Sequence, residues 1–289
     1  MPAGGPDKPR LMENQFQLDD TVAVVTGASG MLGPIWVGAL LDAGARVFAL
    51  DLERASVSSG LQTLLDRYSQ VTHSTGAPRL RLHHADVMDR DSLVVAQAAC
   101  AGTMGVASVL VNNAGIDQPA STDRAASYRM EDVPMDVSRA ILEVNTLGTF
   151  QVSQVFGGEM VKARRGSIIN IGSLYASVSP DLRLYDHMNL DPPFLKPPAY
   201  GASKAAVVNL TRYLATAWGP YGVRVNALSP GGVLGAQDPE FQRKFNDRVP
   251  LGRMAEAADL TGPLRFLASD ASAYVTGTEL RVDGGFTAW

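Results

Sequence analysis

The strongest structural signal in this sequence is Thr21-Val-Ala-Val-Val-Thr26-Gly27-Ala-Ser-Gly30-Met-Leu-Gly33. Its first six residues are apolar or β-branched, which is typical of a buried strand. The glycines follow at once, and a helix-like segment continues to Ala45. Glycines let the backbone approach a pyrophosphate, and the free N–H groups of a helix start then face the phosphates. Strand, glycine turn and helix together therefore indicate a dinucleotide site; a glycine-rich turn without a ligand is the alternative.

The next predicted strand, Arg46–Asp51, ends in a carboxylate. In dinucleotide-binding folds an acid about 20 residues beyond the glycines bonds the adenosine ribose, and its charge repels a 2′-phosphate. Asp51, with Leu52 beside it, therefore favours NAD over NADP. Because Arg54 lies close by in the sequence, NADP stays an alternative cofactor. The alternative role of Asp51 is to cap a helix at the end of the strand.

Strands and helices alternate along the rest of the chain. Further strands are predicted at Leu80–His84, Ser108–Val111, Gly166–Ile171, Val223–Leu228 and Glu279–Val282, and a long helix from about Asp132 to Ala163. Alternation of this kind predicts an α/β fold: a Rossmann-type, doubly wound parallel sheet of about seven strands with helices on both faces. We expect residues 1–18 to form a flexible arm and residues 19–289 a single dinucleotide-binding and catalytic domain.

Composition narrows the functional classes. The 289-residue chain has a net charge of -4 and no basic stripe, which disfavours a nucleic-acid partner. No apolar run approaches the length of a membrane span. A single cysteine, Cys100, fits a reducing compartment, so we expect a cytoplasmic protein. His83 and His84 have no partner at metal-ligand spacing, so no metal site is expected.

Tyr200 and Lys204 head a predicted helix that continues to Trp218. Residues four apart share one helix face. A free phenol titrates near ~10, and an ammonium held close lowers that pKa by favouring the phenolate. The pair therefore suggests a proton-transfer group. Taken alone, it also describes a solvated lysine beside a half-buried tyrosine.

From about Asp19 to Trp289 the chain resembles the short-chain dehydrogenase/reductase family. The resemblance is carried by motifs in family order: TGASGMLG, Asp51, Ala85-Asp86-Val87, Asn112-Asn113-Ala114-Gly115, Asn145, Ser173, Tyr200 with Lys204, Ser229-Pro-Gly-Gly232 and Val282-Asp-Gly-Gly285. It implies hydride transfer to or from a nicotinamide. Tyr200 would exchange the proton of the substrate oxygen, and Lys204 would lower its pKa and bond the nicotinamide ribose. Ser173 would steady the developing oxyanion, and Asn145 would hold a water that links Lys204 to solvent.

The resemblance also implies the residues that line the cofactor. They are Gly27, Ser29, Gly30, Met31, Leu32 and Gly33 in the glycine turn, Asp51 and Leu52, Asp86 and Val87 at the adenine, Asn113, Ala114 and Gly115 at the ribose, Tyr200 and Lys204, and Pro230, Gly231, Gly232 and Val233 at the nicotinamide end. Asp86 has an alternative role as cap of a helix starting near Arg90.

Two features depart from the family pattern. Met31 stands where the ordinary subfamily has its middle glycine, a spacing that resembles the extended subfamily. The chain nevertheless has the length and C-terminal motif of an ordinary member. The gap between Ser173 and Tyr200 is long and contains Ser179–Pro198, a proline-rich loop expected to overhang the substrate. Its Tyr185, His187, Asn189 and Lys196 are candidate substrate contacts beside Ser173 and Tyr200; a packing or oligomer loop is the alternative.

The region Gly235–Gly252 resembles the mobile substrate lid of the family. This region contains the cations Arg243, Lys244 and Arg248, and Arg253 lies just beyond it. These cations suit a phosphate or carboxylate ligand. The alternative is that they form the solvated face of an amphipathic helix. The tail motifs also resemble a subgroup of bacterial oxidoreductases that make sugars for flagellin glycosylation.

These features predict an NAD(H)-dependent oxidoreductase that interconverts an alcohol and a carbonyl on a small polar substrate, with sugars and polyols as the favoured class. Two alternatives stay open: a sugar-nucleotide epimerase or dehydratase that recycles tightly bound NAD, and a non-enzymatic NAD-sensing protein. Relatives pair through their long fourth and fifth helices. A homo-oligomer, dimer or tetramer, is therefore expected, with small residues Gly201-Ala202 and Ala205-Ala206 allowing close packing.

Overall fold

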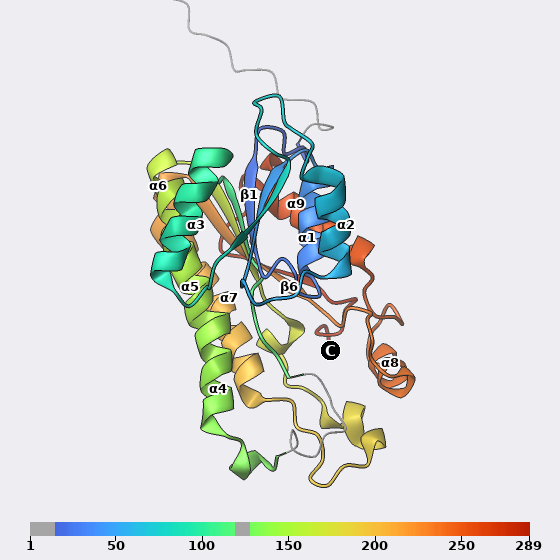
Figure 1. The fold of residues 1–289 in the computed structure, drawn as a ribbon. Helices are drawn as coiled ribbons and strands as arrows, with labels where there is room; N and C mark the ends of the chain where they lie inside the picture. Colours follow the sequence, from blue (N-terminus) through green and yellow to red (C-terminus); the bar gives the residue numbers. More distant parts are fainter. Residues whose placement is uncertain (1–14, 119–127) are drawn as a thin grey trace, which may run out of the picture.

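Seven parallel strands form the centre of the molecule in a computed structural model that describes residues 15–118 and 128–289 (Figure 1). In chain order they are β1 (Val22–Thr26), β2 (Arg46–Asp51), β3 (Leu80–His84), β4 (Val109–Asn112), β5 (Gly166–Ile171), β6 (Val223–Pro230) and β7 (Glu279–Val282). Their order in the sheet is β3-β2-β1-β4-β5-β6-β7. The order reverses between β1 and β4, and open α/β sheets bind ligands outside the carboxyl ends of the strands at such a point. The predicted doubly wound parallel sheet is confirmed.

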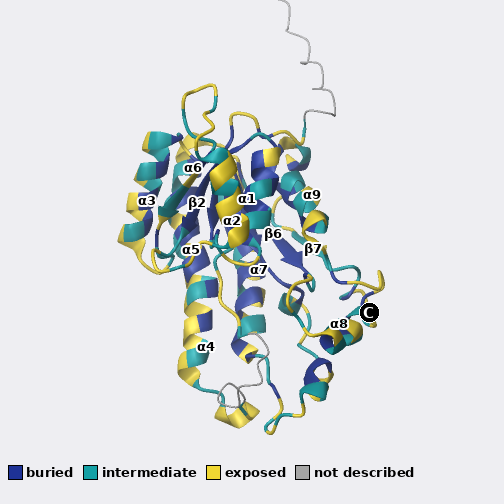
Figure 2. Ribbon diagram, turned by 45° about the vertical axis from the view of Figure 1, so that its right-hand side comes forward, coloured by how far each residue is buried: buried dark blue, intermediate teal, exposed yellow. Residues whose placement is uncertain are grey.

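Helices cover both faces of the sheet. One face carries α1 (Gly33–Asp42), α2 (Ser59–Tyr68) and α9 (Ala257–Ala268), and the other carries α3 (Arg90–Thr103), the α4–α6 region and α7 (Pro198–Trp218) (Figure 1). Each interface has its own buried apolar cluster. The dark blue strands in Figure 2 show that the sheet between them is buried. Leu18, the last residue of the predicted arm, is buried in the first cluster. Cys100 is buried in the second, where burial raises the pKa of its thiol to about 12.

The predicted long helix exists, but its start at Asp132 is wrong. Met130–Asp132 form a separate 3-10 turn, and the α-helix begins at Met135. Pro134 explains the break, because a proline disfavours helical backbone in the residue before it. The helix then alternates regular and widened turns: α4 (Met135–Leu142), the π-helical η4 (Glu143–Gly148), α5 (Thr149–Val152), the π-helical η5 (Ser153–Gly157) and α6 (Gly158–Ala163).

A third apolar cluster lies beyond the sheet, where Ser179–Pro198 meets α8 (Pro239–Asn246). Within this loop, residues Leu182–Met188 form the 3-10 helix η7. The cluster is built mainly from aromatic rings of the loop, of α8 and of the C-terminal segment: Tyr185, Phe194, Phe241, Phe245 and Phe286. The proline-rich loop is therefore packed against the lid region. No helix in the described ranges has both the length and the apolar character needed to cross a bilayer.

Candidate active site

The glycine turn after β1 is shaped by contacts that admit no side chain at two positions. Gly27 has φ +63°, and a Cβ there would lie 2.8 Å from the Ala114 Cα. A Cβ on Gly33 would lie 2.3 Å from the Ala28 carbonyl oxygen. The Asn113 amide then fixes the turn by donating to the carbonyl oxygens of Thr26 and Gly27 at 3.1 and 2.9 Å. The chain here is built for close approach of backbone to backbone, as a dinucleotide turn requires.

The turn has features that fit a dinucleotide. The Asp51 carboxylate accepts a 2.7 Å hydrogen bond from the Ser29 amide and a 2.8 Å bond from the Leu52 amide, so β2 delivers it to the turn. The Ser29 hydroxyl is buried and has no hydrogen-bond partner within the described ranges. Helix α1 starts with no acidic side chain and no side-chain cap in its first turn. Unclaimed donors at a helix start suit a pyrophosphate. Met31 is 67% exposed, so its side chain does not fill the turn.

The two residues predicted at the adenine follow β3. The alternative role of Asp86 as the cap of α3 is wrong, because Asp89 caps that helix by accepting from the Asp91 and Ser92 amides. The Asp86 carboxylate accepts from the Met88 amide instead. Val87 packs toward Gly148 in the long helix, where a Cβ would lie 2.9 Å from the valine methyl.

The residues predicted at the nicotinamide end follow β6, across the sheet from the glycine turn. The Gly231 amide donates to the Val282 carbonyl, and the Gly232 carbonyl accepts from the Ala255 amide. A Cβ on Gly232 would lie 2.5 Å from the Phe245 ring of α8. Pro230 and Val233 are buried on either side. The lid helix thus rests directly on this turn.

The four predicted catalytic side chains come together at the carboxyl end of β5. Ser173 follows the strand, and its hydroxyl is hydrogen-bonded to the Tyr200 phenol. Lys204 lies one turn further along α7; its Nζ is 5.8 Å from the centroid of the Tyr200 ring and donates to the Ile171 carbonyl at 2.9 Å. Asn145 is buried in the π-helical turn and exchanges hydrogen bonds of 2.7 and 3.0 Å with the Ile116 backbone.

The asparagine links the distorted helix to α7. Its amide also donates to the Ser203 hydroxyl at 3.0 Å, so it ties the long helix to α7 next to Lys204. Gly115 fits between these groups: a Cβ there would lie 3.1 Å from Asn145 Oδ1 and 3.6 Å from Lys204 Nζ. Widened helical turns often mark functional positions. A helix-disfavouring asparagine in a long helix was the signal in the sequence.

Burial dominates the electrostatics of the site. It raises the pKa of Tyr200 above its ordinary value, an effect that the Asp117 carboxylate reinforces and the hydrogen bond from Ser173 opposes. Burial lowers the pKa of Lys204 to about 8. The expected lowering of the phenol pKa by Lys204 is thus not seen in the protein alone, where burial and the Asp117 carboxylate both favour the neutral phenol.

Residues from the proline-rich loop reach both the site and the lid. Tyr185 is buried, with its ring 4.8 Å from that of Phe194 and 5.3 Å from that of Phe241, and its hydroxyl is hydrogen-bonded to Tyr175. The Asn189 amide donates to the His187 carbonyl. These contacts hold the loop in shape; the predicted substrate contacts of Tyr185 and His187 stay predictions.

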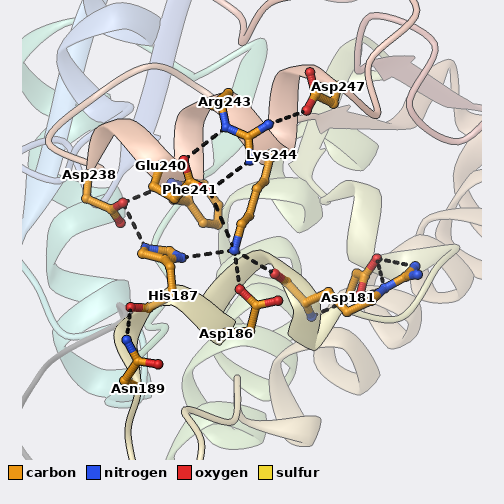
Figure 3. A network of polar contacts seen from close by, with 11 residues as sticks. Asp181, Asp186, His187, Asn189, Asp238, Glu240, Phe241, Arg243, Lys244 and Asp247 are labelled. Atoms are coloured by element: carbon orange, nitrogen blue, oxygen red, sulfur yellow. Dashed lines mark hydrogen bonds and ion pairs between the residues drawn. The ribbon is translucent and has the colours of Figure 1, made fainter.

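Polar contacts join this loop to the lid, as Figure 3 shows. His187 Nε2 lies 2.9 Å from Asp238 Oδ1. Lys244 contacts Asp186 and the Arg183 carbonyl of the loop. Further along, Arg248 pairs with Asp181. Asp186 and Asp181 of the loop therefore meet cations of the lid, and His187 of the loop meets a carboxylate of the lid.

The lid cations are engaged within the protein. Besides the two that pair with the loop, Arg243 bonds Glu240 and Asp247, and Arg253 bonds Asp259. The side chains of Arg243 and Arg253 are 59% and 50% exposed, as the predicted solvated face requires, whereas the Lys244 side chain is only 17% exposed and contacts the loop. The acidic partners lie in another segment or in an adjacent turn.

Comparison with known proteins places this chain in a family. The family model described as enoyl-(acyl carrier protein) reductase matches residues 32–287. The chain is 36% identical to galactitol 2-dehydrogenase (L-tagatose-forming) of Cereibacter sphaeroides, over 95% of this chain and 98% of that one. It is 34% identical to D-threitol dehydrogenase of Mycolicibacterium smegmatis, over 94% and 95% of the two chains.

Solved structures agree with the fold and differ in their cofactor. A short-chain dehydrogenase of Leptospira borgpetersenii with bound NAD+ has a TM-score of 0.78 and 30% identity, covering 99% of this chain and 100% of that one. A gluconate 5-dehydrogenase of Burkholderia cenocepacia in complex with NADP and tartrate has a TM-score of 0.78 and 28% identity, covering 96% and 98%. Together with the site geometry, these matches show that the chain belongs to the short-chain dehydrogenase/reductase family and is an oxidoreductase acting on CH–OH donors.

Proposed function

We propose that this protein interconverts a secondary hydroxyl group of a neutral polyol and the corresponding ketone, with NAD+ and NADH as the cofactor pair. The observation that carries the proposal is the meeting of Ser173, Tyr200 and Lys204 at one strand end. The substrate class is supported by the curated relatives, which are named for galactitol and D-threitol.

The chemistry of oxidation follows from these groups. NAD+, when bound, supplies the hydride acceptor. Tyr200 Oη takes the hydroxyl proton while Ser173 donates a hydrogen bond to the substrate oxygen, so the developing carbonyl is oriented and its charge is stabilised. The charge of Lys204 favours the phenolate over the phenol and so acts against the burial that raises the phenol pKa. Asn145 holds Ile116 and Ser203 in place around the lysine.

A neutral substrate is supported by the state of the lid cations. Each of them is already paired with a carboxylate of the described chain: Arg243, Lys244, Arg248 and Arg253. A phosphate or carboxylate that bound there would meet the negative charge of these acidic partners. A polyol makes no such demand, since its hydroxyls bond without a net charge.

The direct test is a substrate screen with purified protein and NAD+. We expect nicotinamide reduction with galactitol, D-threitol or D-arabinitol and little with aldonates or sugar phosphates. Conversion of a sugar nucleotide with no net change in nicotinamide absorbance would favour an epimerase or dehydratase instead. Failure of every alcohol and ketone to react would contradict the proposal.

NAD is proposed over NADP because of Asp51. Asp51→Ala should lower kcat/KM for NAD+ by about 10- to 100-fold, because a charged hydrogen-bond partner of the ribose is lost. The ratio of kcat/KM for NAD+ to kcat/KM for NADP+ should fall as well. Asp66→Ala on α2, where the carboxylate bonds only Gln62 among the described residues, is the matched control. Initial rates with both cofactors decide the question. Higher kcat/KM with NADP+ than with NAD+ in the unmodified protein would refute the assignment.

We also propose a homo-oligomer that pairs through the long helix and α7. Apolar side chains stand exposed along the long helix, among them Met135 (64%) and Leu147 (56%), and a partner subunit could cover them. Sedimentation should report a dimer or tetramer. Leu147→Glu should shift it toward smaller species, whereas Val95→Glu at a 62% exposed position of α3 should not. A monomeric unmodified protein would rule this out.

A further inference from the structure

Among the described residues of the proline-rich loop, only Lys196 places a charged group over the ring of the proposed catalytic tyrosine, Tyr200. Its Nζ is 5.1 Å from the centroid of the Tyr200 ring and 5.9 Å from that of the Tyr175 ring. Only 10% of its side chain is exposed. The loop therefore places this ammonium group, largely buried, beside Tyr200.

The ion-pair partner of Lys196 is Asp117, which belongs to a different segment of the chain. Lys196 Nζ lies 2.5 Å from Oδ2 of Asp117, which follows the β4 turn two residues after Gly115. The same turn holds Asn145 through the Ile116 backbone. The ion pair therefore bridges the loop and the turn that the mechanism uses.

The pair has unused hydrogen-bonding capacity. An ammonium carries three donors, and the Asp117 carboxylate is the single hydrogen-bond partner of Lys196 within the part of the chain that the structure describes. The Asp117 side chain is 34% exposed, and its second oxygen accepts from the Gln118 amide. A nearly buried ammonium with unfilled donors is costly unless a further acceptor arrives.

We propose that Lys196 and Asp117 form a subsite for the hydroxyl group on the carbon next to the one that reacts. A hydroxyl both accepts and donates, so it fits a site with an ammonium donor and a carboxylate acceptor side by side. A carboxylate in its place would gain from Lys196 but meet the charge of Asp117. The subsite therefore selects vicinal diols and neutral polyols over simple alcohols and aldonates. This inference rests on the proposed function, because it names the substrate class of the same site.

The first test measures binding, so it does not depend on turnover. Galactitol is titrated by calorimetry into protein saturated with NADH, for the unmodified chain and for Lys196→Met, Asp117→Asn and the double variant. Each single variant should weaken galactitol about 10- to 100-fold, the effect of a lost charge-assisted hydrogen bond. Lys162→Met, whose ammonium on α6 is 74% exposed, is the matched control and should bind as the unmodified protein does.

The double variant separates a subsite from a structural pair. A purely structural ion pair leaves an unpaired charge when one partner is removed, so removing both should restore binding. A subsite loses one charged partner of the hydroxyl in each single variant and both in the double variant, so the double variant should bind no better than the single ones. Restored binding in the double variant, or unchanged binding in Lys196→Met, overturns the proposal.

Kinetics provide the specificity readout. With 2,3-butanediol and 2-butanol, which differ only in the neighbouring hydroxyl, Lys196→Met should raise KM for the diol and leave kcat/KM for the monoalcohol nearly unchanged. Equal losses with both substrates would overturn the subsite and assign Lys196 to positioning Tyr200. If the unmodified protein oxidises no alcohol, the proposed function fails, while the calorimetric comparison still decides the subsite.

Discussion

Replacing Tyr200 by phenylalanine should lower kcat for polyol oxidation by about 10²- to 10⁴-fold, the usual contribution of a positioned general base. The ring and its packing beside Tyr175 remain, so the fold and NAD+ affinity should not change. Tyr175→Phe is the matched control, because it removes a hydroxyl that is hydrogen-bonded to Tyr185 in the same cluster. Steady-state kinetics and NAD+ titration check both variants.

The pH profile of the unmodified protein tests the same assignment. Burial raises the pKa of Tyr200, and oxidation needs its deprotonated form, so kcat/KM for the polyol should rise as the solution becomes alkaline. Ketone reduction needs the protonated phenol and should not share this rise. Full turnover by Tyr200→Phe, or an oxidation rate that falls from neutral to alkaline pH, would remove Tyr200 from the proton-transfer role.

The sequence predicts those parts of the site that lie within short segments. The glycine turn, the strand-end Asp51 and the Tyr200–Lys204 spacing are local patterns, and each sits on the element expected for it. Their meeting at one edge follows from the parallel sheet, because the carboxyl ends of its strands share that edge.

The sequence does not predict contacts between side chains of distant segments. Lys196 and Asp117 are 79 residues apart in the chain, and no local pattern pairs them. Likewise, Arg248 and Asp181 meet only because the proline-rich loop packs on the lid. A lysine or arginine in a sequence shows its charge and not its partner, so the lid cations resembled an anion site. The helix break at Pro134, in contrast, has a local cause, because a proline disfavours helical backbone in the residue before it.

Lys204→Met should reduce turnover by about 10²-fold or more and, unlike most active-site losses, make the cofactor-free protein more stable. Burial lowers the pKa of Lys204 to about 8 from an ordinary value of 10.5. Below pH 8 the folded chain therefore keeps a buried charge at a cost of a few kcal/mol, since each pKa unit corresponds to ~1.4 kcal/mol. Methionine removes this cost and loses one hydrogen bond, to the Ile171 carbonyl, of about 1 kcal/mol. The melting temperature at pH 7 should rise by a few degrees.

The pH dependence distinguishes this cause from improved packing. Between pH 8 and 10.5 the unfolded chain holds the lysine proton and the folded chain has released it, so the stability of the unmodified protein rises with pH across that window. The advantage of Lys204→Met should therefore shrink as pH rises toward 10.5, whereas improved packing would give a constant advantage. Lys204→Arg, which keeps its charge, should be less stable throughout. A Lys204→Met variant that melts below the unmodified protein at pH 7 would show that the folded protein compensates the buried ammonium and holds Lys204 without loss of stability.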